Sequence, residues 1–227
     1  MELVVSNYGT YVHPQNDMVG NIINACDDFS YSFTSGVYFL TGEIDIGAWS
    51  FAYSLTNDAK KIPVNYSSIV LNGNSVDITE LRKQSFHVGQ YKIYGKKTFK
   101  YVIEKALKTS KSNCTYNELL KKYDFYFEGA EEWRMNCVRH KIWYISPLVG
   151  LALKKKIFVF PWLSKKVYLS DFFQRAYDLL INEDVIVLVP CSEKIQFPTG
   201  GRYNVVRMAT LFDIFIEHGF DFEKDHR

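Results

Sequence analysis

The sequence predicts an α/β fold built around a parallel central sheet with a helical insert. Three short apolar runs have the character of strands buried on both faces: "GVYFLT" at 36–41, "KIFVF" at 156–160 and "DVIVLVP" at 184–190. Helical patterns separate these runs, and strands that alternate with helices pair in parallel. A chain of 227 residues with 47% hydrophobic residues can bury such a core. We expect one domain over 1–227.

Two further strands are expected near the N-terminus. The segment "ELVVSNYGTYV" at 2–12 is rich in β-branched and aromatic residues. The segment "SSIVLNG" at 67–73 ends in an Asn72-Gly73 turn. We expect both strands to lie at sheet edges.

Helical periodicity is found in four segments, at 97–108, 116–125, 143–156 and 169–184. The third contains Pro147, which either interrupts the helix or lies in its first turn. The fourth has Ser170 as its expected N-cap and a single apolar face. Most of the chain between Gln90 and Lys156 is therefore expected to be a helical insert.

Composition excludes several classes of function. With 27 Lys+Arg against 25 Asp+Glu, no overall field attracts nucleic acid. The 4 cysteines lie far apart, a spacing that matches neither a zinc knuckle nor a disulfide framework. This cysteine usage favours a reducing, cytoplasmic location. No signal peptide or membrane span is expected. The histidines lack an H-E-x-x-H or G-x-S-x-G context, and His87 is interpreted as a surface or satisfied side chain.

The stretch "GEIDIGAWS" at 42–50 lies between the first buried run and the next helix. Gly42 and Gly47 have the spacing of the two glycines in the phosphate-binding motif G-x-x-x-x-G-K-[ST]. Such glycines allow a tight turn and bring backbone N–H groups close to phosphates. Taken alone, two glycines are a weak match and favour an ordinary strand–helix turn.

The side chains of this loop differ from the motif. Ala48 stands where lysine would contact the β- and γ-phosphates, and Trp49 stands where a hydroxyl would hold magnesium. Ser50 keeps a hydroxyl one place later, and Asp45 adds a negative charge inside the loop. The loop thus has the backbone of a phosphate site without its charges.

The order of these parts resembles the nucleotide-binding domain of an ABC transporter, over about residues 2–192. The stretch "VNYSSIVLNGNSVDITELRKQSFHVGQ" at 64–90 is similar to the turn-containing strand and glutamine loop of that family. The resemblance implies a P-loop NTPase-like core with a largely parallel central sheet, an N-terminal antiparallel β portion and a helical subdomain at about 91–145. It also implies that Gln90, at the family spacing after Ala48, is the glutamine that contacts magnesium and senses the γ-phosphate.

The same resemblance places the other catalytic positions on unsuitable residues. Pro161 stands at the magnesium-binding aspartate of Walker B, and Trp162 at the glutamate that polarises water. The segment "CVRHK" at 137–141 falls at the signature position without the glycines of L-S-G-G-Q, and Cys191 falls at the switch histidine. We expect a degenerate domain without ATP hydrolysis, for which ATP stays a possible ligand and magnesium is not expected.

The expected function is therefore that of a docking or regulatory partner in a transporter. The implied partner is an active ATP-binding subunit or a permease, and contact with it would hold the chain at the inner face of the membrane. In the family, coupling helices of permeases dock at about 90–143 of this numbering. Aromatic residues that would anchor such a contact are Tyr91, Tyr94, Tyr123, Tyr126 and Trp133.

Two alternatives stay open. A residual nucleotide-binding enzyme would use backbone amides, the helix N-terminus and Ser50 in place of the lysine. An α/β interaction domain or enzyme outside the P-loop class would make the family register a coincidence. If the loop is purely structural, Trp49 is expected to fold inward over the space that phosphates would occupy.

Overall fold

A computed structural model of the protein describes residues 1–12, 24–42, 47–89, 95–138, 141–162, 171–192 and 203–208. Within these ranges one sheet is parallel, with the strand order β10-β3-β9-β8-β7. Its strands are β3 (Gly36–Gly42), β7 (Ser85–His87), β8 (Ile157–Val159), β9 (Ile186–Ser192) and β10 (Tyr203–Arg207). The three apolar runs in the sequence are thus confirmed as neighbouring parallel strands, β3, β9 and β8.

Both faces of this sheet are covered. Along β3, Val37 and Phe39 face a core formed with the helices, whereas Tyr38 and Leu40 face a second core formed with the other sheet. Successive side chains of a strand point to opposite faces, so a strand between two cores has no polar face. This is why these strands are continuously apolar in the sequence.

The second sheet is antiparallel. It contains β1 (Glu2–Val12), β2 (Asn24–Thr34), β4 (Val64–Asn65), β5 (Ser68–Leu71) and β6 (Asn74–Ser75). The expectation that 2–12 is an edge strand is wrong, because β1 pairs with β2 on one side and with β4 and β5 on the other. An antiparallel strand of 11 residues is long enough to serve two short partners in succession. The Asn72-Gly73 turn is confirmed, with φ values of 50° and 77° between the paired residues Leu71 and Asn74.

The described ranges contain a helix in each of the four expected segments, one directly after Gly47 as expected, and one at 78–84 that was not predicted. They are α1 (Ala48–Ser54), α2 (Ile78–Gln84), α3 (Phe99–Thr109), α4 (Tyr116–Lys122), α5 (Ile142–Ala152) and α7 (Asp171–Ile181). Helix α5 runs through Pro147, which lies beyond its first turn and costs the helix one backbone hydrogen bond. At α4, Thr115 and Glu118 form a capping box. The expected N-cap Ser170 lies outside the described residues.

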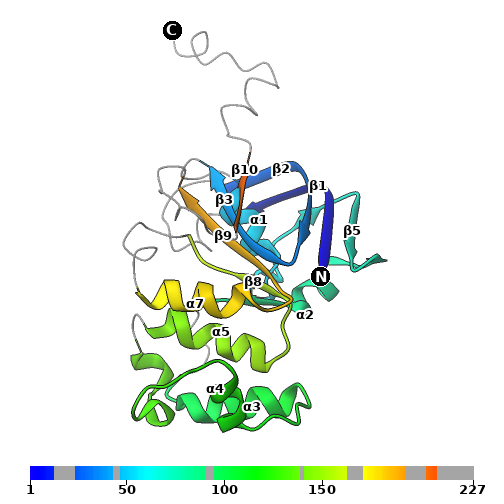
Figure 1. The fold of residues 1–227 in the computed structure, drawn as a ribbon. Helices are drawn as coiled ribbons and strands as arrows, with labels where there is room; N and C mark the ends of the chain where they lie inside the picture. The colour runs from blue at the N-terminus through cyan, green and yellow to red at the C-terminus, as the bar shows by residue number, and fades with distance from the viewer. Residues whose placement is uncertain are drawn as a thin grey trace, which may run out of the picture.

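Figure 1 shows the layers. Helices α7, α5 and then α4 with α3 are stacked on one side of the parallel sheet, and α1 lies between the two sheets. Gly150 allows α5 to lie close to the sheet, because a Cβ atom there would clash with the ring of Phe158 and lie 2.9 Å from Cδ1 of Phe86. The division of 1–227 into one domain with a helical subdomain at about 91–145 stays a prediction.

Candidate functional site

The phosphate-loop candidate lies at the carboxyl end of the parallel sheet. Strand β3 ends at Gly42, which pairs with Ser192 of β9, and α1 begins at Ala48. Open α/β sheets bind ligands at this end of their strands. Gly47 precedes α1 with φ 48°, a backbone conformation that favours glycine. Asp45 and the rest of 43–46 lie outside the described residues.

The first residues of α1 face inward. Ala48 is fully buried and belongs to the core between the sheets. Ser50 is also fully buried, and its hydroxyl donates a hydrogen bond to the carbonyl of Gly47 at 3.0 Å. The Ser50 hydroxyl, one place after the motif position, is therefore committed to the backbone and closed to water.

Trp49 is buried as well, with 8% of its surface exposed. Its ring stacks on Tyr53, and it packs with side chains from the segment after α1 and from the end of β8. We refer to this group as the Trp49 cluster: Trp49, Tyr53, Ala59, Ile62 and Trp162. The expectation of an inward-facing Trp49 is confirmed. Whether its ring overlies the 43–46 segment lies outside the described residues.

The positions expected to supply Walker B carboxylates carry none. Pro161 and Trp162 follow β8, and both are partly buried. Trp49 and Trp162, which the sequence resemblance places at the magnesium-binding and water-polarising positions, contribute to one apolar cluster. Cys191 on β9 is fully buried, and this burial raises the pKa of its thiol to about 12. It cannot replace a histidine as a proton acceptor near neutral pH.

A second group of polar residues borders the cluster. His87, at the end of β7, contacts Asp58 of the short helix η2 (Asn57–Ala59), with 3.2 Å between Nδ1 and Oδ2. Its ring also meets Tyr53 edge-on, with centroids 5.4 Å apart. The interpretation of His87 as a satisfied side chain is confirmed. Gln90 itself lies outside the described residues.

Arg82 fixes the segment that carries Asp58 and Ile62. Its guanidinium is buried and donates to the backbone carbonyls of Ser54 at 2.8 Å, Lys60 at 3.3 Å and Ile62 at 3.1 Å. Burial lowers the pKa of the Arg82 side chain. Sequence reasoning missed Tyr53, Asp58 and Arg82; only Tyr53, four residues after Trp49 on a helix, carried a local signal.

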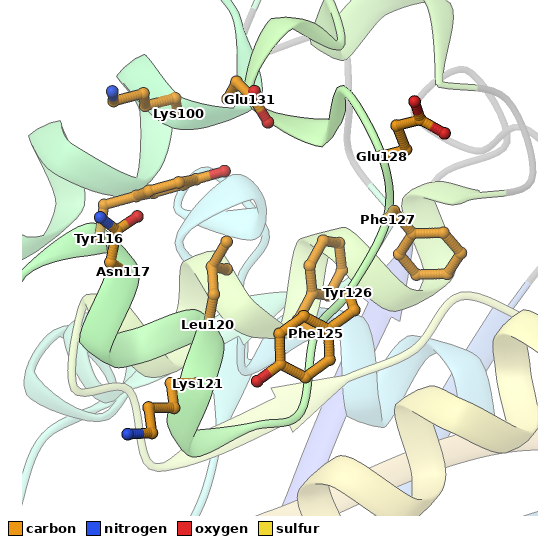
Figure 2. A pocket seen from close by; sticks show the side chains of 10 residues that line it. All are labelled: Lys100, Tyr116, Asn117, Leu120, Lys121, Phe125, Tyr126, Phe127, Glu128 and Glu131. Carbon is orange, nitrogen blue, oxygen red and sulfur yellow. The ribbon is translucent and has the colours of Figure 1, made fainter.

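The helical layer contains a pocket of about 690 Å³ that is open to solvent. Figure 2 shows its walls, which come from α3, from α4 and from the segment that follows α4: Lys100, Tyr116, Asn117, Leu120, Lys121, Phe125, Tyr126, Phe127, Glu128 and Glu131. Tyr126 is 70% exposed at this pocket. We refer to it as the α3–α4 pocket.

Tyr116 is the unusual member of this pocket. Its hydroxyl is buried and, among the described residues, has no hydrogen-bond partner. Burial, with the nearby charges of Glu131 and Glu104, raises the pKa of Tyr116 to about 12. Of the expected anchors besides Tyr126, Tyr123 and Trp133 are half-buried and pack on the helical core, and Tyr91 and Tyr94 lie outside the described residues.

The described ranges hold neither a metal-binding cluster nor a membrane-spanning helix. No group of three or more His, Cys, Asp or Glu side chains there is arranged to hold a metal ion. Likewise, none of the helices described here combines the length and apolar character that crossing a bilayer requires.

No protein-family model matches the chain, and neither does any curated protein. Solved structures do. The chain superimposes on a protein from Pyrococcus furiosus assigned as an ABC transporter ATP-binding protein, with a TM-score of 0.61 and 11% identity, over 91% of this chain and 98% of that one. It is also similar to cbiO1 of Clostridium perfringens, part of the ABC transporter complex cbiONQ. The TM-score is 0.59 at 11% identity, and the match covers 98% of this chain and 96% of cbiO1.

A third match is a bacterial Atm1-family ABC exporter with ATP bound. Its TM-score is 0.58 at 12% identity, over 96% of this chain and 40% of the exporter. The fold is therefore that of an ABC transporter ATP-binding domain. At 11% to 12% identity, the likeness concerns the fold alone.

Proposed function

We propose that this chain is a degenerate ABC transporter ATP-binding subunit that does not hydrolyse ATP and acts as a docking or regulatory partner of a transporter. The observation that carries this proposal is the Trp49 cluster, which includes the second residue of α1, the helix that follows the β3–α1 connection. In P-loop NTPases, a lysine and a hydroxyl of this loop and a carboxylate of Walker B hold the phosphates and magnesium. Buried alanine and apolar rings provide none of these contacts.

The size of the expected loss in reaction rate supports the absence of catalysis. Loss of one preorganised group in an active site commonly lowers the rate by about 100-fold or more. Here the residues at four catalytic positions, Ala48, Trp49, Pro161 and Trp162, offer neither a cation nor an oxygen ligand from their side chains. The alternative in which Ser50 replaces the missing groups is disfavoured, because its hydroxyl is buried and donates to Gly47.

The α3–α4 pocket supports the docking part of the proposal. An exposed aromatic side chain beside an open apolar hollow is typical of a protein interface, and Tyr126 has this arrangement. Lysines from α3 and α4 and glutamates from the segment after α4 give the pocket charges of both signs. We infer a permease or an active ATP-binding subunit as the partner, through which the chain would associate peripherally with the cytoplasmic face of a membrane.

Catalysis is tested with the full chain and Mg-ATP. We expect phosphate release no greater than that of a boiled control, and no nucleotide-dependent rise in melting temperature. A ligand at about 100 times its Kd would add about 2.7 kcal/mol to the free energy of unfolding, which a melting experiment readily detects. Steady phosphate release that is abolished by Gly47→Trp would overturn the proposal.

Docking is tested by co-expression with the permeases and ATP-binding subunits encoded beside the gene. We expect a stable complex with one of them, weakened by Leu120→Lys in the pocket. Tyr101→Ala is the matched control, because Tyr101 is 46% exposed on α3 and does not line the pocket. If none of these proteins forms a complex with the wild-type chain, the docking role is wrong.

A further inference from the structure

The Trp49 cluster brings together three parts of the chain. Trp49 and Tyr53 belong to α1, Ala59 and Ile62 to the segment after it, and Trp162 to the segment that follows β8. The contacts are close: the rings of Trp49 and Tyr53 have centroids 4.5 Å apart. Trp162 packs against this cluster, so apolar side chains link α1 and the segment after it with the residues that follow β8.

The contacts continue to the end of β7. The Tyr53 ring meets the His87 ring edge-on, and His87 contacts the Asp58 carboxylate at 3.2 Å. The His87 side chain is only 10% exposed. Its partner, the Asp58 side chain, is 30% exposed, so solvent weakens this contact less than it would a fully exposed pair, but water still reaches it. Strand β7 is thus attached both to α1 and to η2.

From β7 the contacts reach the helical layer. The next residue but one, Gly89, donates its backbone N–H to the Ser146 hydroxyl of α5 at 3.0 Å. A Cβ atom on Gly89 would lie 2.8 Å from Cζ3 of Trp143, so the backbone lies directly against that ring. Gly89 has φ 89°, which further favours glycine. The position of the β7 end is therefore linked to the start of α5.

In an active P-loop NTPase, the magnesium ion is held jointly by the loop hydroxyl and the Walker B aspartate, so the two elements are bridged only when nucleotide is present. We propose that in this chain the Trp49 cluster, together with His87 and Asp58, is a built-in brace that replaces this bridge. It holds α1, the end of β8 and the end of β7 in one arrangement without a ligand.

This inference rests on the proposed function and adds a consequence to it. Since Gly89 continues the contacts to α5, the brace also fixes one side of the helical layer that contains the α3–α4 pocket. A partner would meet the same surface whether or not ATP is present. The chain would act as a constant element of a transporter rather than as one that responds to each cycle of ATP binding.

The test is amide hydrogen exchange on the full chain, measured at 85–89 and 142–149. Trp49→Phe keeps an aromatic ring but shortens it, and Asp58→Asn removes only the charge that faces His87. We expect exchange at 85–89 to be about tenfold faster in the first variant and about threefold faster in the second, as local openings become easier. Exchange at 142–149 should also rise in Trp49→Phe.

Glu80→Gln is the matched control. It removes a carboxylate that pairs with Lys83 at 3.1 Å on α2, directly before β7, but outside the brace. It should leave exchange at 85–89 unchanged. If Asp58→Asn and Trp49→Phe both behave like this control, the brace is wrong.

A parallel measurement with Mg-ATP separates this inference from the proposed function. We expect no change in exchange at 85–89. Fast exchange in the variants together with steady phosphate release from Mg-ATP would leave the brace in place, so only the proposed function would fail. Slower exchange at 85–89 with Mg-ATP would show that nucleotide changes this arrangement, which would contradict the brace. If exchange in the variants equals that of wild type and Mg-ATP has no effect, the brace is wrong and the proposed function is unaffected.

Discussion

The indole of Trp49 lies nearly flat on the ring of Tyr53, one helical turn later in α1, with 13° between the ring planes and 4.5 Å between their centroids. Residues four apart on a helix share a face, so this pair forms as soon as α1 does. The stacked pair and the residues around it leave Trp49 8% exposed. A large apolar surface thus occupies the side of α1 on which a catalytic loop would carry a hydroxyl.

Trp49→Ala is expected to lower the free energy of unfolding by about 3 to 5 kcal/mol, the usual cost of truncating a buried aromatic side chain. It should create no affinity for ATP, because removing the ring restores neither a cation nor an oxygen ligand. Urea denaturation measures the first effect and a nucleotide titration the second. Tyr101→Ala, at an exposed site, should change stability by less than about 1 kcal/mol.

Ala48→Lys restores the motif residue but is expected not to restore nucleotide binding. Ala48 is fully buried in the core between the sheets, so a lysine there would crowd its neighbours and bury an ammonium group. We expect a lower melting temperature and no Mg-ATP-dependent stabilisation. A clear rise in melting temperature with Mg-ATP would show that the side chain at 48 can reach a phosphate site.

Arg82→Lys is expected to lower the free energy of unfolding by about 3 kcal/mol, although it keeps the charge. A lysine cannot reproduce a planar fork that contacts three carbonyls, and it would leave buried acceptors without donors. Lys83→Met, one residue later at an exposed position, is the control and should be nearly neutral. Equal effects of the two substitutions in urea denaturation would contradict this role.

Tyr116→Phe is expected to be neutral or to raise the free energy of unfolding by about 1 kcal/mol. The Tyr116 hydroxyl is buried without a partner among the described residues, and an unsatisfied buried polar group is destabilising. Tyr8→Phe provides the contrast, because the Tyr8 hydroxyl shares a hydrogen bond with Ser54 at 2.7 Å. That variant should be less stable than wild type. A loss of stability in Tyr116→Phe as large as in Tyr8→Phe would indicate a bonded hydroxyl.

Cys191 is expected to resist alkylation at pH 8.5 until the chain unfolds. Burial raises the pKa of its thiol to about 12, whereas an unfolded cysteine ionises near pH 8.5. The contribution of this thiol to stability is therefore complete below about pH 8.5 and is lost as the pH rises towards 12. The exposed Cys137 should react quickly in the native state, and mass spectrometry distinguishes the two sites. Equal labelling of both in the native protein would contradict the burial.

The strands that could be predicted from the sequence are those buried on both faces, because such burial requires apolar residues along the strand. β3, β8 and β9 lie between two cores and are uniformly apolar, so they were identified without knowledge of their partners. β2 was missed, although Phe29, Tyr31 and Phe33 alternate along it, because polar residues interrupt the run and its pairing with β1 is a tertiary property.

For the candidate site, the order of the elements predicted a connection between β3 and α1, and the structure has β3 end at Gly42 and α1 begin at Ala48. The assignment of substituted catalytic positions stays a prediction. The side chains that pack around Trp49 could not be predicted from the order of the elements. Asp58 and His87 lie 29 positions apart, and Arg82 contacts carbonyls 20 to 28 positions earlier. No local pattern specifies which side chains meet after folding, so the nature of the apolar cluster required the structure.

The close approach of α5 to the sheet has a consequence for how this protein evolves. Position 150 tolerates nothing larger than hydrogen while rings stand at Phe86 and Phe158. A side chain could be acquired there only if a ring opposite it became smaller, so the positions should change in concert across diverging descendants. Such paired exchanges would identify distant relatives of this chain even where Gly42 and Gly47 are no longer retained.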